Sequence, residues 1–268
     1  MNSIRPPAVA GLFYPAEREL LAASIERLVD PAAAASELHA LAVIAPHAGY
    51  VYSGAIAGHA YAAVAPWRGR ARRVVVAGPA HRVYVSGIAV PSVQAFATPL
   101  GRVALDRVAL ERLAQLPWVE TSDAAHAQEH CIEVQLPFLQ AVLGTFELVP
   151  MVVGDATPAQ MASTLEAVWD AGSTLVVVSS DLSHYLPWDA ARTRDAATAR
   201  AIVALKADLE PEDACGAAPI NGLLRVARSR GLAARVLDVR NSGDTAGDRE
   251  RVVGYGSFEF VEEARAHA

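Results

Sequence analysis

The stretch LAVIAPHAGYVYSG, residues 41–54, joins a short, continuously apolar run to a histidine and a glycine-containing turn. A run of four to eight apolar residues bounded by turn residues is typical of a strand that is buried on both faces of a sheet. We therefore predict a strand over 41–46 that carries His47 at its carboxyl end. A histidine in that position can be a buried hydrogen-bonding residue, a loop residue or a metal ligand.

The same alternation of apolar runs and helical segments continues along the chain. We predict strands over 41–46, 73–78, 147–153, 174–180, 234–239 and 252–260. We predict helices over 17–29, 54–64, 106–116, 158–171, 188–206 and 219–230, with Ser53 and Asp106 as N-caps and Gly172 and Gly231 at helix C-termini. The pattern indicates an α/β single-domain sandwich around a mixed, mostly parallel central sheet. Because no repeat or linker divides the sequence, we expect one domain over residues 1–268.

Two segments depart from this pattern. Residues 83–102 are strand-like with interspersed turn residues, which indicates a β-excursion before the helix at 106. Residues 129–143 have helical spacing, but Pro137 is expected to break or kink that helix, because proline lacks a backbone N–H and clashes with the preceding turn.

Composition limits the partners and the setting. The chain has 23 Lys and Arg residues against 29 Asp and Glu residues, a formal net charge of −6, so no general field attracts nucleic acid or an anionic membrane. Its two cysteines, Cys131 and Cys215, are too few for a disulfide framework. No apolar stretch approaches the roughly 18–20 residues of a membrane span, and two prolines interrupt the N-terminal segment where a signal peptide would need an apolar run. We expect a cytoplasmic protein.

Polar side chains follow four of the predicted strands: His47, His81, the pair Asp181 and His184, and Asp244. In open α/β sheets, ligands bind outside the carboxyl ends of the strands. A single histidine after a strand is more often structural than functional. The recurrence at several strand ends favours a shared site.

Two neutral imidazoles and one carboxylate form a set that suits non-haem iron(II) with open positions, and zinc accepts similar ligands. His184 would then be available as an acid–base group. Asp181 could either orient His184 or cap the following helical turn. In the sequence EHCIE, Glu129 and His130 fit both structural ion pairing and the lining of a site.

Several motifs together resemble a known family. They are IAPHAGYVYSG (44–54), GPAHRV (78–83), TPLG (98–101), EHCIEVQLPF (129–138), VVSSDLSHY (177–185), CGAAPI (215–220), NSGD (241–244) and VVGYGS (252–257). In this order, and over nearly the whole chain, they resemble the Memo-like proteins, which in prokaryotes are also called AmmeMemoRadiSam system protein B. That family resembles in fold the class III extradiol dioxygenases, which hold iron(II) with two histidines and a glutamate and use a further histidine as acid–base catalyst.

The resemblance implies roles for individual residues. His47 and His81 match the two histidine ligands, and His184 matches the catalytic histidine of the dioxygenases. In animal Memo proteins a cysteine completes the site, and ungapped alignment back from Tyr255 places that cysteine at Thr245. Because threonine is a poor ligand for a divalent metal, we predict that the neighbouring Asp244 supplies a carboxylate instead. The alternative for Asp244 is a turn in which it accepts a hydrogen bond from nearby backbone.

These observations predict a Memo-like metal-binding protein that acts as a non-haem iron-dependent redox enzyme on a small-molecule substrate. Iron(II) is the expected metal, with copper or zinc as alternatives, and the metal ligands are His47, His81 and Asp244. His184, Asp181 and Glu129 are the predicted catalytic residues. Two other functions remain open: a hydrolase in which His184 or Glu129 accepts a proton from metal-activated water, and an adaptor that binds metal or peptide without catalysis. The family name further implies a radical-SAM protein and an AMMECR1-type protein as partners.

Overall fold

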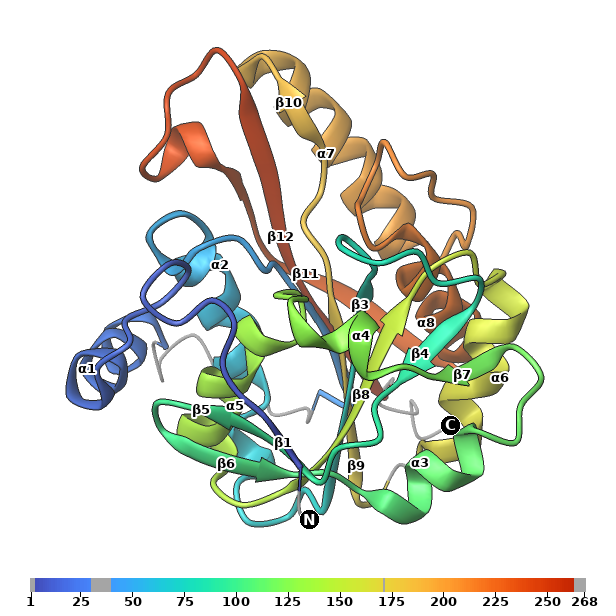
Figure 1. Ribbon diagram of the computed structural model, residues 1–268. Coiled ribbons are helices and arrows are strands. Elements are labelled where there is room, and N and C mark those ends of the chain that lie inside the picture. Colours follow the sequence, from blue (N-terminus) through green and yellow to red (C-terminus); the bar gives the residue numbers. More distant parts are fainter. Residues whose placement is uncertain (1–2, 30–39, 171, 263–268) are drawn as a thin grey trace, which may run out of the picture.

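A large mixed sheet forms the centre of the computed structural model, which describes residues 3–29, 40–170 and 172–262 (Figure 1). Its strands follow the order β10 (His184–Leu186), β12 (Val252–Glu262), β2 (Ala42–Ala45), β9 (Thr174–Ser179), β3 (Arg73–Pro79), β8 (Glu147–Val153), β4 (Ile88–Val90) and β7 (Val119–Thr121), and β11 (Leu232–Asn241) pairs with β12. The four central strands, from β2 to β8, are parallel to one another. Both flanks are joined to them by antiparallel pairings, β12 to β2 and β4 to β8. The predicted mixed α/β sheet is confirmed, with its parallel part at the centre.

The central strands are buried because helices cover both faces. Every residue of β2 and β9 is buried, as are Val74, Val75 and Val76 of β3. On one side, α1 (Arg18–Leu28), α2 (Tyr50–Ala63) and α5 (Leu136–Leu143) pack against one another; on the other side lie α6 (Pro158–Val168), α7 (Trp188–Val203) and α8 (Ala217–Arg230) (Figure 1). This double coverage explains why these strands read as continuous rather than alternating apolar runs.

The segment 83–102 forms the predicted β-excursion, which divides between two sheets. Its first strand is β4 of the large sheet. The next two, β5 (Ala95–Thr98) and β6 (Gly101–Ala104), form a small sheet with β1 (Ile4–Arg5). The short helices α3 (Arg107–Leu113) and α4 (Asp123–Ala127) complete this part of the chain.

Two predicted helix ends are confirmed. Asp106 is the N-cap of α3, where its side chain accepts a hydrogen bond from the backbone N–H of Ala109 at 2.9 Å. Gly231 ends α8 in the left-handed conformation, with φ of 66°, which glycine adopts without steric cost.

Three other predictions about helix ends are wrong. Helix α2 begins at Tyr50 with Gly49 as its N-cap, and the hydroxyl of Ser53 donates back to the carbonyl of Ala48. Helix α6 ends at Val168, before Gly172. Pro137 does not break a helix, because it lies in the first turn of α5, where its missing N–H has no helical partner in any case.

Among the described residues, no helix has the length and apolarity needed to cross a membrane.

Candidate metal centre

Three histidine rings meet at the carboxyl edge of the parallel strands. His47 follows β2 and His81 follows β3, and both of these strands pair with β9. His130 comes from the segment between α4 and α5. The ring centroids are 5.2 Å apart for His47 and His81, 5.3 Å for His47 and His130, and 4.6 Å for His81 and His130. Each ring can offer one nitrogen, and these three atoms lie within 4.8 Å of one another.

Hydrogen bonds around His47 determine which of its ring nitrogens carries the proton. The Gln135 amide group donates from Nε2 to the Pro46 carbonyl at 3.0 Å and to Ser179 Oγ at 2.7 Å. Ser179 Oγ donates its own proton to the Cys131 carbonyl at 2.5 Å. Because the Ser179 hydroxyl has no second proton, it accepts from His47 Nδ1–H, 2.9 Å away. Nε2 of His47 therefore carries a lone pair that a cation can use.

Glu129 determines the proton position on His81 in the same way. Its Oε1 lies 2.9 Å from His81 Nδ1, and its Oε2 accepts from the backbone N–H of His81 at 2.7 Å. Burial opposes the charge, but the neighbouring His130 and His81 side chains hold the pKa of Glu129 well below its usual range. An ionised carboxylate only accepts, so Nδ1 of His81 carries a proton, and Nε2 is the ring nitrogen left to bind a cation. A carboxylate behind a histidine in this manner is a common support for a metal ligand.

His130 is the least constrained of the three rings. Its Nδ1 lies 3.2 Å from Glu129 Oε1, yet this buried nitrogen makes no hydrogen bond to any residue that the structure describes. The ring packs against Phe13, with 4.8 Å between centroids. A buried nitrogen that has a carboxylate beside it but no hydrogen bond among the described residues can serve as a further ligand of a cation, because a buried polar group needs a partner.

The protonation state of His47 also suits a metal ligand. Burial, reinforced by the repulsion of the His130 and His81 rings, lowers the pKa of His47 well below 6.5. The ring is therefore neutral near pH 7, and a metal does not have to displace a proton from it. The donor set of three imidazoles thus fits a divalent metal ion.

Of the predicted catalytic residues, Asp181 contacts His47. Its Oδ1 accepts from the backbone N–H of His47 at 2.8 Å, and burial raises the pKa of Asp181. His184, on β10, has its Nδ1 2.8 Å from the Leu182 carbonyl. Because a carbonyl only accepts, Nδ1 of His184 carries a proton, and Nε2 is the ring nitrogen left for proton exchange.

The structure does not bring Asp244 into the histidine cluster. Asp244 lies in the 3₁₀ turn Ser242–Asp244, is exposed, and uses both carboxylate oxygens locally. Its Oδ1 accepts from Trp188 Nε1 at 2.7 Å, and its Oδ2 accepts from the backbone N–H of Asn241 at 3.1 Å. The adjacent Thr245 donates its hydroxyl to the Ser242 carbonyl.

Reasoning from strand ends missed three residues of this site. His130 follows no strand, so only its place in EHCIE pointed to it. Ser179 is the last residue of β9 and Gln135 precedes α5. Both act on His47 through contacts between distant segments, which a single sequence does not display.

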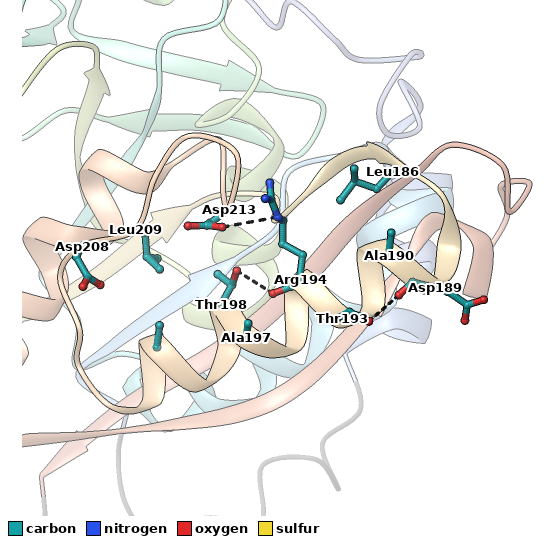
Figure 2. Close-up of a pocket in the computed structure, with 11 residues that line it drawn as sticks. Leu186, Asp189, Ala190, Thr193, Arg194, Ala197, Thr198, Asp208, Leu209 and Asp213 are labelled. Carbon is teal, nitrogen blue, oxygen red and sulfur yellow. Dashed lines mark hydrogen bonds and ion pairs between the residues drawn. The ribbon is translucent and has the colours of Figure 1, made fainter.

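A hollow of about 880 Å³ lies away from these residues, along α7 (Figure 2). It is lined by one side of that helix and by residues of the segment 208–213, and Arg194 and Asp213 form an ion pair of 4.0 Å across it. Because no histidine of the cluster lines this hollow, it is separate from the candidate metal centre.

Known proteins resemble this chain over almost its entire length. The family model described as "Memo-like protein" matches residues 5–259. A MEMO1 family protein of Ignicoccus hospitalis is 36% identical over 285 residues, covering 96% of this chain and 98% of that protein. A MEMO1 family protein of Archaeoglobus fulgidus is 35% identical, covering 96% and 99%. The solved structure of the uncharacterized protein JW3007 from Escherichia coli K12 covers 81% of this chain and 98% of that one, at a TM-score of 0.49 and 15% identity. The family match and the two relatives show that the chain belongs to the Memo-like protein family.

Proposed function

We propose that this chain is a metal-dependent redox enzyme that uses iron(II) and acts on a small substrate with oxygen donor atoms. The observation that carries the proposal is the meeting of three imidazoles in which the Nε2 lone pairs of His47 and His81 are fixed by their hydrogen-bond partners. Iron(II) suits imidazole ligands, and a bound ion with open positions would supply a centre for the oxygen atoms of the substrate.

The side chains around the cluster have distinct roles in this proposal. His47 and His81 hold the metal through Nε2, and His130 is the third side chain able to reach it. His184 is the acid–base group: its Nδ1–H is bonded to the Leu182 carbonyl, so Nε2 accepts a proton from the substrate. Asp181 holds the backbone of His47 in place.

Metal content and oxygen consumption test the proposal. Protein purified without oxygen and loaded with Fe(II) should hold about one ion per chain and consume oxygen with a small compound that carries adjacent oxygen atoms. His47→Ala should lose the ion. His184→Gln should keep the Fe(II) binding isotherm and lower the turnover about 10² to 10⁴-fold, as general acid–base groups do. Equal metal content in wild type, His47→Ala and His81→Ala would refute the site.

A second candidate is a metal-dependent hydrolase. The donor set itself favours it, because three imidazoles with an open position are also a ligand set of catalytic zinc. His184 would then accept a proton from the metal-activated water, since Glu129 is already engaged by His81. Hydrolysis supported by Zn(II) without oxygen consumption would select this function over the first. The radical-SAM and AMMECR1-type partners stay a prediction that co-purification would test.

A further inference from the structure

One peptide group links a buried carboxylate to the ring of His184. The carbonyl of Leu182 lies 2.8 Å from His184 Nδ1, and the N–H of the next residue, Ser183, donates to Asp195 Oδ1 at 3.0 Å. This C=O and this N–H belong to the same peptide bond, which is planar, and no described peptide bond is cis. Because a trans peptide group points its N–H and C=O in opposite directions, Asp195 and the His184 ring lie at the two ends of one rigid unit.

Asp195 is itself held in a fixed position. It lies within α7 and is only 2% exposed. Gly254 of β12 packs directly against its carboxylate, since a Cβ atom at position 254 would collide with Asp195 Oδ2. The carboxylate is therefore enclosed between the helix and the strand, which leaves it little freedom to move away from Ser183.

The strand pairing around His184 does not orient this peptide group. Strand β10 has three residues, and its pairing with β12 shifts register between His184 and Leu186. The backbone of Gly254 accepts from the N–H of Leu182 and donates to the carbonyl of Ser183, both at 2.8 Å. These two groups belong to the preceding and the following peptide bonds. Among the described residues, the partner of the Ser183 N–H is therefore Asp195.

A carboxylate at one end of the peptide group strengthens the hydrogen bond at the other end. Hydrogen bonds to an ionised acceptor are about twice as strong as neutral ones, and hydrogen bonds in a chain polarise one another. The Leu182 carbonyl is therefore a better acceptor for His184 Nδ1–H when Asp195 is ionised. Burial raises the pKa of Asp195, and the hydrogen bond from the Ser183 backbone acts in the opposite direction.

We propose that Asp195 is a positioning residue for His184, which acts through the peptide group of Leu182 and Ser183 to keep a proton on Nδ1 and to leave Nε2 for proton exchange. The inference rests on the proposed function, in which His184 is the acid–base group. When Nε2 takes a proton from the substrate, the ring gains a positive charge while Nδ1–H stays bonded to the Leu182 carbonyl. The carboxylate of Asp195 stabilises that charge through the polarised peptide group.

Nitrogen NMR of full-length, zinc-loaded protein with isotope-labelled histidine tests the inference, because protonated and unprotonated ring nitrogens differ in chemical shift. His184→Gln assigns the signals among the eight histidines. At pH 8, which favours the ionised carboxylate, the neutral His184 ring of wild type should carry its proton on Nδ1. Asp195→Ala should populate the Nε2–H form and speed exchange of the Nδ1 proton with water at least about fivefold, which corresponds to ~1 kcal/mol for one hydrogen bond.

Two further variants separate the charge of Asp195 from its shape and from a general field. Asp195→Asn keeps an acceptor of the same shape without the charge, so its exchange rate should lie between those of wild type and Asp195→Ala. Asp189→Asn is the matched control, because it removes the same charge from the exposed first turn of the same helix and should match wild type. Equal changes in Asp189→Asn and Asp195→Asn would overturn the inference, as would a proton on Nε2 in wild type. If Asp195→Ala does not fold, wild-type signals in Asp195→Asn refute the inference.

The same spectra test the metal site separately. Zinc should shift the Nε2 signals of His47 and His81. If these signals did not respond to zinc, the metal site would be refuted, and the effect of Asp195 would still be read from the His184 signals. Unchanged His184 signals in both Asp195 variants would refute the inference and leave the metal site in place.

Discussion

The position of the proton on the His47 ring depends on one hydroxyl group, that of Ser179. We therefore expect substitution of Ser179 to lower the affinity of the candidate site for metal. Ser179→Ala removes the acceptor of His47 Nδ1–H and frees the ring to change its tautomer and rotate. Loss of a group that orients a metal ligand typically costs 10 to 100-fold in metal affinity, and we expect this range for Fe(II) or Zn(II) by titration.

Ser257→Ala is the control for this substitution. Ser257 is also a fully buried serine, but its hydroxyl has no hydrogen-bond partner in the described part of the chain. The Ser257→Ala variant should therefore bind metal with the same affinity as wild type. Equal affinities for Ser179→Ala and Ser257→Ala would show that the hydroxyl of Ser179 does not control the His47 ring.

The third ligand of the metal can be tested by comparing His130 with Asp244. Because His130 lies in the cluster and Asp244 uses both oxygens in a local turn, His130→Ala should weaken metal binding at least tenfold and Asp244→Ala should leave it nearly unchanged. Titration with one divalent metal under the same conditions measures both. If Asp244→Ala weakened metal binding more than His130→Ala, Asp244 would be the third ligand, as predicted from the sequence.

The buried His126 should make folding sensitive to mild acid. Burial lowers the pKa of His126 to about 4, from 6.5 in an unfolded chain. Its contribution to stability is therefore complete above pH 6.5 and is lost as the pH falls toward 4, because the unfolded state binds the proton first. Between pH 7 and pH 5 this residue alone should reduce the free energy of unfolding by about 2 kcal/mol.

Urea unfolding at these two pH values, with a chelator present, measures the effect. His126→Gln removes the titrating group, so the variant should lose about 2 kcal/mol less than wild type between pH 7 and pH 5. An identical loss in both proteins would mean that His126 is not the group that responds.

At the scale of elements, β1 and the segment that follows it hold the loop that carries Glu129 and His130. Arg5, on β1, donates to the carbonyls of His126 and Glu129 at 2.6 and 2.7 Å and forms a 2.6 Å ion pair with Glu133. Glu133 is fully buried and accepts further hydrogen bonds from Ala8, Val9 and Tyr14. The loop that carries Glu129 and His130 is thus held in position by a segment more than one hundred residues away in the sequence.

Arg5→Met should therefore affect both folding and metal binding. The substitution leaves the buried Glu133 carboxylate without its cation, which typically costs 3–5 kcal/mol of stability. Metal affinity should fall as well, because the backbone around Glu129 loses two donors. Arg194→Met, which breaks the exposed pair with Asp213, should cost less than about 1 kcal/mol and leave metal binding unchanged. Equal effects on unfolding in the two variants would contradict the importance of the buried pair.

The strands that could be predicted from the sequence are those long enough for their own residues to show a recognisable apolar pattern. All six predicted strands exist. Five of them are largely buried apolar runs, as two-sided burial requires, whereas β11 is mostly half-buried or exposed. Strands β1, β7 and β10 have two or three residues each, too few to show a period. The start of α2 could not be predicted because the hydroxyl of Ser53 turns back to Ala48 instead of capping the helix.

The same limit applies to the candidate site. His47 and His81 could be predicted because parallel strands end at one edge of the sheet. Asp244 was predicted by the same rule, but β11 continues past the end of β2: Ile44 pairs with Phe258, which pairs with Val236, whereas β11 runs on to Asn241. Relative to Ala45, the last residue of β2, Asn241 lies three residues, or about 10 Å, further along the strand direction. The turn with Asp244 therefore lies at the tip of the β11–β12 hairpin, which extends beyond the end of β2 (Figure 1).

At the scale of the whole molecule, the candidate metal centre joins segments that are far apart in the chain. His47 follows β2, His81 follows β3, and His130 precedes α5. The unfolded chain cannot hold these groups together, so a metal that binds them stabilises the folded state by mass action. At a free metal concentration of 100 times the Kd, the gain is about 2.7 kcal/mol, which for a chain of this size corresponds to a rise in Tm of about 5–10 °C.

Thermal unfolding with and without metal, followed by circular dichroism, measures this coupling. Wild type should gain the stated shift and lose it when a chelator is added, and His47→Ala should show little or no shift. His59→Ala is the matched control: His59 lies on α2, outside the cluster, with its Nε2 3.5 Å from Asp238, so the variant should gain the same shift as wild type. If His47→Ala were stabilised as strongly as His59→Ala, the metal would bind elsewhere on the protein, and the histidines at the strand ends would have a purely structural role.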